Sequence, residues 1–387
     1  MNQEYYRKLI SGRSGGLTAT LLRFILGLVS RFYLAGILLR NFLYSRGWLK
    51  THRVNAVVIS IGNITTGGTG KTPLVIWLCK FLQRKEFRCA VLTRGYKTAK
   101  DPRLKTQDYR DEPAILAESC PQAKVIVNPD RVAGAAEAVD KFGAKVLIMD
   151  DGFQHRRLAR DLDIVAIDAT QPFGYGKMLP AGLLREPVSA LKRADAVVIT
   201  RCDQISESEL SQIEKRLQLI NPDMIIARSI HAPICVKYSK RFVISAEAGI
   251  RKNGETMDPC TSRNDSIEQL NGKNIFAFCG IGNPGAFLNT IKSLGANLVG
   301  SKIYNDHHHY TNSNIVDICR RAGELKADLI LTTQKDWTKL IFDFRLSIVD
   351  CRDIPLAYLV IDLKFPAGED MLTGLIEDAL AGKIQQE

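Results

Sequence analysis

Short apolar runs alternate with longer amphipathic stretches along this chain, and the alternation predicts strands separated by helices. Brief runs rich in Val, Ile and Leu are typical of buried parallel strands. In the first part of the chain they fall at residues 57–61, 88–93, 124–127, 145–149, 163–168 and 196–200. Helix-like stretches follow several of them, as after residues 73 and 131. The pattern predicts an α/β fold with a parallel sheet flanked by helices.

A second, smaller set of the same pattern follows residue 274. Strands are predicted at 275–278, 328–333 and 357–361, with a helix at 286–294. Residues 240–273 are polar and contain glycine and proline, which indicates an exposed insertion or linker. We therefore expect a second, smaller α/β domain after this linker.

One apolar stretch near the start is too long for a strand. Residues 17–43 are strongly apolar, but Arg23, Arg31 and Arg40 interrupt them, so no uncharged run reaches the roughly 20 residues that span a bilayer. Basic residues flank the stretch, and long arginine side chains can reach lipid headgroups. We expect an interfacial helix on an anionic membrane. The alternative is a first helix buried against the sheet.

The run at 57–61 leads into the most specific chemical signal of the chain. Residues 62–72, GNITTGGTGKT, form a glycine-rich turn before an apolar, helix-like segment. In such a turn, backbone N–H groups converge on phosphate oxygens at a helix N-terminus. Lys71 then reaches the terminal phosphates of ATP, and the Thr72 hydroxyl binds Mg²⁺. The residues expected to contact the nucleotide are Thr65, Thr66, Gly67, Gly68, Thr69, Gly70, Lys71 and Thr72.

The turn departs from the strict phosphate-binding loop at one position. The pattern G-x-x-x-x-G-K-[ST] requires glycine at position 65, where this chain has Thr65 between Gly62 and Gly67. The alternative is an ordinary strand-to-helix turn. Gly-Lys-Thr directly after a buried strand favours phosphate binding.

Polar residues at other strand ends are candidates for the same site. The run at 145–149 ends in Asp150 and Asp151, and carboxylates at a strand end hold Mg²⁺ in nucleotide-hydrolysing or transferring sites. We expect one of the two to bind the metal, and the sequence leaves the choice open. Arg94 follows the strand at 88–93, on the sheet edge where ligands gather. Residues 172–186 form a long loop that is a candidate substrate-binding element.

Charge and cysteine content indicate the kind of partner and the redox compartment of this protein. The formal net charge of +12 predicts an anionic partner. Positive charge concentrates near the apolar N-terminus, and no basic run is interleaved with aromatic residues, so we expect a membrane and no nucleic acid. Nine cysteines without a C-x-x-C pair indicate free thiols in a reducing compartment and argue against a zinc site.

Further motifs complete an ordered set. The set comprises NITTGGTGKTP at 63–73, TRGY at 93–96, DEP at 111–113, NPDR at 128–131, DDGFQH at 150–155, LPAG to RE at 179–186, FCGIGNP at 278–284, DHHHY at 306–310 and TTQKD at 332–336. Together these motifs resemble the tetraacyldisaccharide 4′-kinase family of lipid A synthesis. They cover most of the chain, and the ordered set is far more specific than any member. The family also has threonine in place of the first loop glycine.

The resemblance implies a membrane-surface kinase that moves the γ-phosphoryl group of ATP to the 4′-hydroxyl of a lipid-linked disaccharide 1-phosphate. It implies that Asp111 is the catalytic base, assisted by His307, with Lys71 at the phosphates. On residue pattern alone, Asp111 could equally be a helix N-cap. The acceptor is then a glycolipid, tetraacyldisaccharide 1-phosphate, at the cytoplasmic face of the inner membrane, and we expect a monomer.

The resemblance also assigns roles to basic and aromatic residues. Arg94 and Arg131 match arginines near the nucleotide, and Arg185 and Tyr96 match residues near the anionic acceptor. Two departures leave roles open. Gln334 stands where the family has glutamate, and His308 and His309 follow His307, so the acting histidine is not fixed.

These observations divide the chain into four expected parts. Residues 1–50 form a membrane-associated helical segment, 51–235 a P-loop kinase domain, 236–273 a linker or insertion and 274–387 a smaller C-terminal α/β domain. The alternative function is a P-loop NTPase, a switch or a transport ATPase, which uses the same loop and acidic strand but needs no sugar acceptor.

Overall fold

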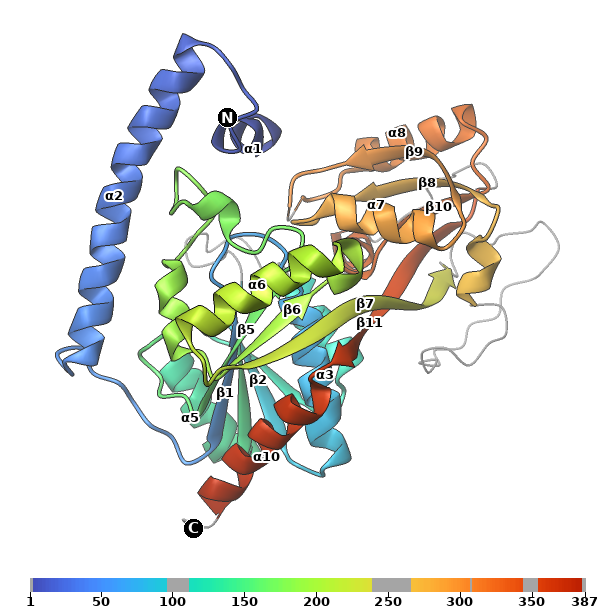
Figure 1. Ribbon diagram of the computed structural model, residues 1–387. Coiled ribbons are helices and arrows are strands. Elements are labelled where there is room, and N and C mark those ends of the chain that lie inside the picture. The colour runs from blue at the N-terminus through green and yellow to red at the C-terminus, as the bar shows by residue number, and fades with distance from the viewer. Residues whose placement is uncertain (1–2, 96–110, 239–265, 307, 344–353, 385–387) are drawn as a thin grey trace. The chain divides into compact units, whose positions relative to one another are not determined.

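The computed structural model describes residues 3–95, 111–238, 266–306, 308–343 and 354–384 (Figure 1). The chain forms two compact units. The first comprises Met1–Tyr109, Leu116–His231 and Leu363–Glu387, and the second comprises Arg110–Ile115 and Ala232–Asp362. Residues 363–387, which we grouped with the C-terminal domain from the sequence, are thus part of the first unit. The expected domain boundaries remain predictions.

A parallel sheet forms the centre of the first unit, as predicted. Its strands are β1 (Val57–Gly62), β2 (Cys89–Thr93), β3 (Lys124–Val127), β4 (Val146–Asp150), β5 (Leu162–Asp168), β6 (Ala196–Thr200) and the first half of β7 (Ile225–Tyr238). Their order is β3-β2-β4-β1-β5-β6-β7, and each neighbouring pair is parallel. Strand β1 lies between β4 and β5, with Ile61 level with Asp150. The carboxyl ends of β1 and β4 therefore meet at one edge.

Helices cover both faces of this sheet. They are α3 (Lys71–Arg84), α5 (Arg131–Phe142), α6 (Glu207–Ile220) and α10 (Glu369–Ile384), while α4 (Asp111–Ser119) runs from the second unit into the first. Alternate residues of β1 point to opposite faces. Val57, Ile59 and Ile61 pack with α3 and α10, and Val58 packs with α5. Burial on both faces explains why the strands are continuous apolar runs.

Two helices precede the sheet, α1 (Gln3–Ile10) and the long α2 (Leu17–Ser45), and both belong to the first unit (Figure 1). By length and composition, α2 is apolar enough to cross a bilayer. One of its faces packs on the body through Tyr33, Leu34 and Ile37. The opposite face exposes a stripe of large apolar side chains, namely Leu21, Phe24, Ile25, Leu28, Val29, Phe32, Leu38, Leu39 and Phe42.

The second unit is also α/β. It contains β8 (Asn274–Cys279), β9 (Asn297–Ile303), β10 (Leu329–Thr333), most of β11 (Leu356–Ala367), α7 (Pro284–Ser293), α8 (Asn312–Glu324), α9 (Gln334–Asp343) and a 3-10 turn at Ile267–Leu270. Strand order is β11-β10-β8-β9, again with parallel pairs. The sequence did not indicate β7 or β9.

The cysteines differ in part from the sequence expectation. Five have free, buried thiols, namely Cys79, Cys89, Cys120, Cys202 and Cys279. Cys235 and Cys319 are disulfide-bonded, so the expectation of free thiols throughout was wrong for these two.

Candidate functional site

The glycine-rich turn ends at Gly70, which is the N-cap of α3 and adopts a left-handed backbone with φ of 84°. Glycine is required here for two reasons. Other residues seldom adopt this conformation, and a Cβ atom on Gly70 would lie 2.7 Å from His231 Nε2. The first-turn N–H groups of α3 have no partners within the helix and carry its positive dipole end. The turn therefore offers an anion-binding site at Lys71 and Thr72.

Neighbouring polar side chains fix the shape of this turn. The Asn63 amide donates to Thr69 Oγ1 at 3.0 Å, and the Thr200 hydroxyl donates to the Thr69 carbonyl at 2.9 Å. Gln154 donates to the Asn63 carbonyl at 2.8 Å. Asn63, Thr69 and Thr200 are buried. The turn is thus held in place before any phosphate arrives.

Thr65 replaces the expected glycine because this part of the turn pairs with another segment. Its backbone bridges Leu184 in antiparallel fashion, and the Thr66 N–H donates to the Leu183 carbonyl at 2.8 Å. The Thr65 side chain is buried, and a Cβ on Gly174 would lie 3.1 Å from its methyl group. An extended, paired residue needs no glycine.

Asp151 forms the centre of a cluster of charges at the end of β4. Its two carboxylate oxygens each lie 2.9 Å from Arg185 Nη1, and Lys71 Nζ lies 3.3 Å from Oδ1. Burial alone would raise the pKa of Asp151, but the Lys71 ammonium and the Arg185 guanidinium outweigh it and lower that pKa to about 2. The geometry connects three predicted site residues and gives Asp151 two cationic partners.

Asp150 is the last residue of β4, and its side chain is buried. The Thr93 hydroxyl at the end of β2 lies 3.5 Å from Asp150 Oδ2. Arg131, the buried first residue of α5, donates from Nη2 to the Asp150 carbonyl at 2.9 Å. Arg131 thus supports the main chain of the acidic turn. Arg94 follows β2 directly and is exposed.

A buried charge pair lies beside the turn at the ends of β5 and β6. Arg201 Nη1 contacts Asp168 Oδ2 at 2.5 Å. Burial, reinforced by Arg201, holds the pKa of His231 well below its usual range, so this imidazole is neutral against Gly70. The first unit therefore surrounds its glycine turn with fixed polar groups on several sides.

In the second unit, the later motifs come together. Lys335 Nζ lies 3.4 Å from Asp306 Oδ1. The buried Asp336 carboxylate accepts from the Gly280 N–H at 3.0 Å and from the Thr333 hydroxyl at 2.8 Å. The motifs that begin at Phe278, Asp306 and Thr332 thus form one cluster.

Several predicted residues are not placed in detail. His307 and Tyr96 lie outside the described residues, and Asp111 begins α4 but its side chain is not described. His308 Nε2 lies 3.0 Å from Asn314 Oδ1. Gln334 is the first residue of α9. Which histidine acts, and the role of Gln334, remain predictions.

No group of three or more His, Cys, Asp or Glu side chains suited to holding a metal ion occurs in the described part of the chain.

Sequence reasoning missed the residues that support the site. Thr200 ends β6, and its position at the carboxyl end of a parallel strand could have signalled it. Asn63 and Glu186 lie inside the quoted motifs, but nothing in their pattern indicated a partner. Such hydrogen bonds join residues far apart in the chain, as between Thr69 and Thr200.

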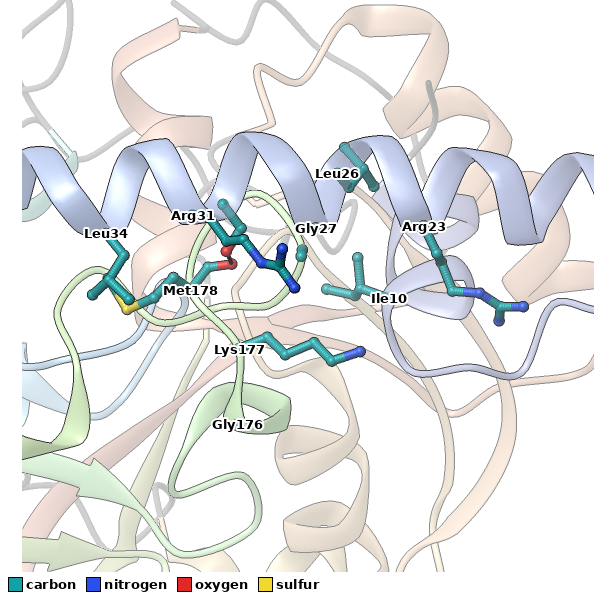
Figure 2. Close-up of a pocket in the computed structure, with 11 residues that line it drawn as sticks. Ile10, Arg23, Leu26, Gly27, Arg31, Leu34, Gly176, Lys177 and Met178 are labelled. Carbon is teal, nitrogen blue, oxygen red and sulfur yellow. Dashed lines mark hydrogen bonds between the residues drawn. The ribbon is translucent and has the colours of Figure 1, made fainter.

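A pocket of about 340 Å³ lies between the N-terminal helices and the loop around residues 176–181 (Figure 2). Its cationic lining residues are Arg23, Arg31 and Lys177, and none of the described residues that line it is acidic. Ile10 and Leu26 belong to its apolar lining. Positive charge beside apolar surface is suited to an anionic amphiphile.

Comparisons with known proteins extend over nearly the whole chain. The profile of the family described as tetraacyldisaccharide-1-P 4′-kinase (LpxK) matches residues 22–381. The tetraacyldisaccharide 4′-kinase of Halothermothrix orenii is 34% identical over 381 residues, which cover 95% of this chain and 96% of that protein. The enzyme of the same description from Syntrophotalea carbinolica is 33% identical over 396 residues, with coverage of 99% and 98%.

A solved structure agrees with these relatives. The crystal structure described as the "apo" form of LpxK from Aquifex aeolicus in complex with ATP aligns with a TM-score of 0.64. The two sequences are 27% identical, and the alignment covers 93% of this chain and 99% of that one.

Proposed function

The chain belongs to the tetraacyldisaccharide 4′-kinase family of lipid A biosynthesis, and from that premise we propose how its residues divide the work of phosphoryl transfer. Its activity is the ATP-dependent 4′-phosphorylation of a tetraacyldisaccharide 1-phosphate. Because the match to this kinase family covers nearly the whole chain, the alternative of an NTPase without a sugar acceptor is set aside. One observation carries the assignment of roles: Lys71, Asp151 and Arg185 form a single ionic cluster at the glycine turn.

In this proposal, the glycine turn and the N-terminus of α3 bind the β and γ phosphates of ATP. Phosphoryl transfer requires mainly positioning and charge neutralisation. Lys71, at the first residue of α3, supplies a positive charge at the phosphates. The preorganised Thr69 and Gly70 segment supports this role, since backbone dipoles that are already aligned need no reorganisation during the reaction.

Thr72 and Asp150 are the residues that would hold Mg²⁺. Their hydroxyl and carboxylate oxygens are the hard ligands that this ion prefers. Asp150 is the better of the two aspartates because the Asp151 carboxylate already contacts Lys71 and Arg185. When bound, the ion neutralises charge on the phosphate oxygens.

Three arginines have different expected tasks at this edge. Exposed Arg94 is free to turn toward the nucleotide phosphates, whereas Arg131 supports the Asp150 main chain and acts on the nucleotide through that position. Arg185 has its guanidinium on Asp151 and faces the phosphoryl group that moves to the acceptor. These roles rest on charge and position.

The acceptor side of the reaction rests on the family resemblance. Asp111 would take the proton of the 4′-hydroxyl, His307 would orient or assist it, and Tyr96 would contact the sugar. The cationic pocket beside α2 supports an anionic amphiphile as acceptor, because Arg31 and Lys177 lie next to apolar side chains there.

Membrane attachment through α2 follows from its two faces. Arg23 and Arg31 line the pocket, and Arg40 contacts Glu186. The stripe runs from Leu21 to Phe42, and exposed Arg31 lies beside it where the helix borders the pocket. Because the other face packs on the body, we propose that α2 lies in the cytoplasmic leaflet of the inner membrane without crossing it.

The test is phosphate transfer from radiolabelled ATP to purified tetraacyldisaccharide 1-phosphate in mixed micelles. We expect a labelled product only with this acceptor, and ATP consumption only in its presence. Equal ATP hydrolysis without acceptor would contradict the kinase assignment for the purified protein and favour the NTPase alternative.

Variants then test the individual roles. Lys71→Ala should lower kcat by orders of magnitude, while Lys85→Ala, at the other end of the same helix, should not. Asp111→Asn should lower kcat by roughly 10²- to 10⁴-fold, as expected for loss of a general base. The matched control is Asp140→Asn, an exposed residue of α5. Near-normal turnover of Asp111→Asn would show that another group takes the proton.

A further inference from the structure

Glu186 is a charged side chain with no exposed surface. Its carboxylate accepts hydrogen bonds from Arg193 Nη1 at 3.0 Å, Arg40 Nη2 at 3.3 Å and Asn41 Nδ2 at 3.1 Å. Arg193 ends the 3-10 helix at Val188–Arg193, whereas the other two partners come from α2. A buried carboxylate is costly unless it is paired, so this arrangement depends on α2 staying in place.

The preceding residue, Arg185, joins the same network to the glycine turn. Its guanidinium holds Asp151, and its N–H donates to the Ile64 carbonyl at 2.7 Å. Its own carbonyl accepts from the Tyr33 hydroxyl of α2 at 3.1 Å. Two consecutive residues thus contact both α2 and the phosphate-binding edge.

The contact between α2 and this loop extends over three helical turns. The buried Ser30 hydroxyl donates to the Met178 carbonyl at 2.9 Å. Ser30, Tyr33, Ile37, Arg40 and Asn41 recur at the spacing of one helix face. Met178 and Leu184 supply the apolar surface on which that face packs.

We propose that Glu186 is a positioning residue through which α2 holds Arg185 against Asp151 and Lys71. The packing of α2 on the body is then needed for turnover, in addition to the role of α2 in membrane attachment. The proposal rests on the proposed role of Arg185 in the site. If α2 leaves the body, Glu186 keeps only Arg193 among its described partners, and the Arg185 carbonyl loses its Tyr33 donor. The loop then loses the contacts that aim the guanidinium.

The experiment separates catalysis from attachment. Asn41→Ala and Tyr33→Phe each remove one hydrogen bond to the loop without changing the exposed apolar face. We expect each to lower kcat by about tenfold, with the KM for ATP, binding to anionic phospholipid vesicles and the unfolding temperature nearly unchanged. Ser45→Ala is the matched control, because its hydroxyl bonds only to Phe42 of the same helix among the described contacts. It should retain wild-type kcat.

A double-mutant cycle tests whether the effect passes through Arg185. Glu186→Gln keeps the shape of the side chain but removes its charge. If Glu186 acts by positioning Arg185, this change should lower kcat in the wild type and have little further effect in Arg185→Ala. A purely structural role would give costs that multiply, together with a lower unfolding temperature, and that result would overturn the proposal.

The outcomes distinguish this proposal from the assignment of the site. Impaired Arg185→Ala with multiplicative costs would leave the proposed function intact and refute the coupling. Normal turnover of Arg185→Ala would refute both the role of Arg185 and the coupling through it. Wild-type kcat in Asn41→Ala, Tyr33→Phe and Glu186→Gln alike would refute the coupling alone.

Discussion

At this site, the charges of neighbouring residues determine whether a side chain is ionised. Asp151 is ionised at any assay pH because Lys71 and Arg185 overcome its burial. The same pairing fixes both cations beside the glycine turn, where positive charge is needed. Removal of either cation leaves a partly buried carboxylate with one partner, which is why charge deletions here should affect turnover more than surface deletions do.

His155 gives a prediction for pH dependence. Burial, with Arg131, Arg160 and Arg157 against Asp130, lowers the pKa of His155 to about 4. In the unfolded chain, His155 takes up a proton near pH 6.5. The contribution of the neutral His155 side chain to the free energy of unfolding is therefore fully present above that pH and is lost as the pH falls toward 4. Between pH 7.5 and 5 the free energy of unfolding should fall by less than about 2 kcal/mol, because the imidazole is only partly buried and solvent screens the neighbouring charges. His155→Gln should remove this part of the pH dependence.

Denaturant unfolding at the two pH values measures the effect. The difference in unfolding free energy between pH 7.5 and 5 should be smaller in His155→Gln than in the wild type. Equal differences in both proteins would show that the histidine is not held neutral by its surroundings.

The sequence was sufficient for residues whose chemistry is local. Gly70, Lys71 and Thr72 are consecutive, and their type and order alone indicate phosphate binding. It was insufficient where a partner lies far along the chain. Thr65 was recorded as a departure from the pattern, and only its pairing with Leu184 explains it. Glu186 was visible in a motif, but its partners Arg40 and Asn41 are 146 and 145 positions away.

At the scale of the element, α2 combines two roles on two faces. The sequence indicated the helix, and the structure gives Leu17–Ser45 for the predicted 17–43. The arginines interrupt the apolar stretch in the sequence, and in the structure Arg23 and Arg31 line the pocket while Arg40 contacts Glu186. Which face of a helix is buried depends on the segment that it packs against. For α2 that segment is the loop at 178–186, which is distant in sequence.

The exposed stripe of α2 predicts how membrane binding can be weakened without touching the site. Phe24 and Phe32 are 71% and 72% exposed. Phe24→Ser and Phe32→Ser should each lower the affinity for anionic vesicles by roughly tenfold, since each removes a large apolar side chain from the lipid. Vesicle sedimentation measures this. Leu219→Ser, on α6 and 86% exposed, is the control that should retain full binding.

These substitutions are sharper than deletion of the segment. Deleting the residues before Arg46 should also release the protein from vesicles, but it would remove Arg40 and Asn41, the α2 partners of Glu186, as well. Undiminished vesicle binding of the two serine variants would contradict attachment through this face.

At the scale of the molecule, the first unit is assembled from separate stretches of chain. The sequence predicted most strands of the sheet because each is a continuous apolar run. It missed β7, in which buried Ala227 and Ser229 alternate with the less buried Arg228. Chain order suggested that residues after 274 form one group, whereas the end of β11, from Leu363, and α10 belong to the first unit.

Contacts of α10 explain this return. Trp77 of α3 donates to Glu369 at 3.0 Å and packs on Phe365, with ring centroids 4.9 Å apart. Lys383 contacts Asp161 at 3.0 Å. Leu372 and Ile376 are fully buried in the cluster that also contains α3. The helix that begins with Lys71 is therefore supported by the C-terminal segment.

This support predicts that the C-terminal helix stabilises the nucleotide site. Leu372→Ala should lower the free energy of unfolding by about 2–5 kcal/mol, because it leaves a cavity beneath α3. Met371→Ala, one residue earlier and 58% exposed, should change it by less than about 0.5 kcal/mol. Denaturant unfolding followed by circular dichroism, with nucleotide binding measured in parallel, should show both properties lost together in Leu372→Ala. Equal stability of the two variants would mean that α10 does not support α3, and a first unit ending at residue 235 would then be expected to fold and bind nucleotide without it.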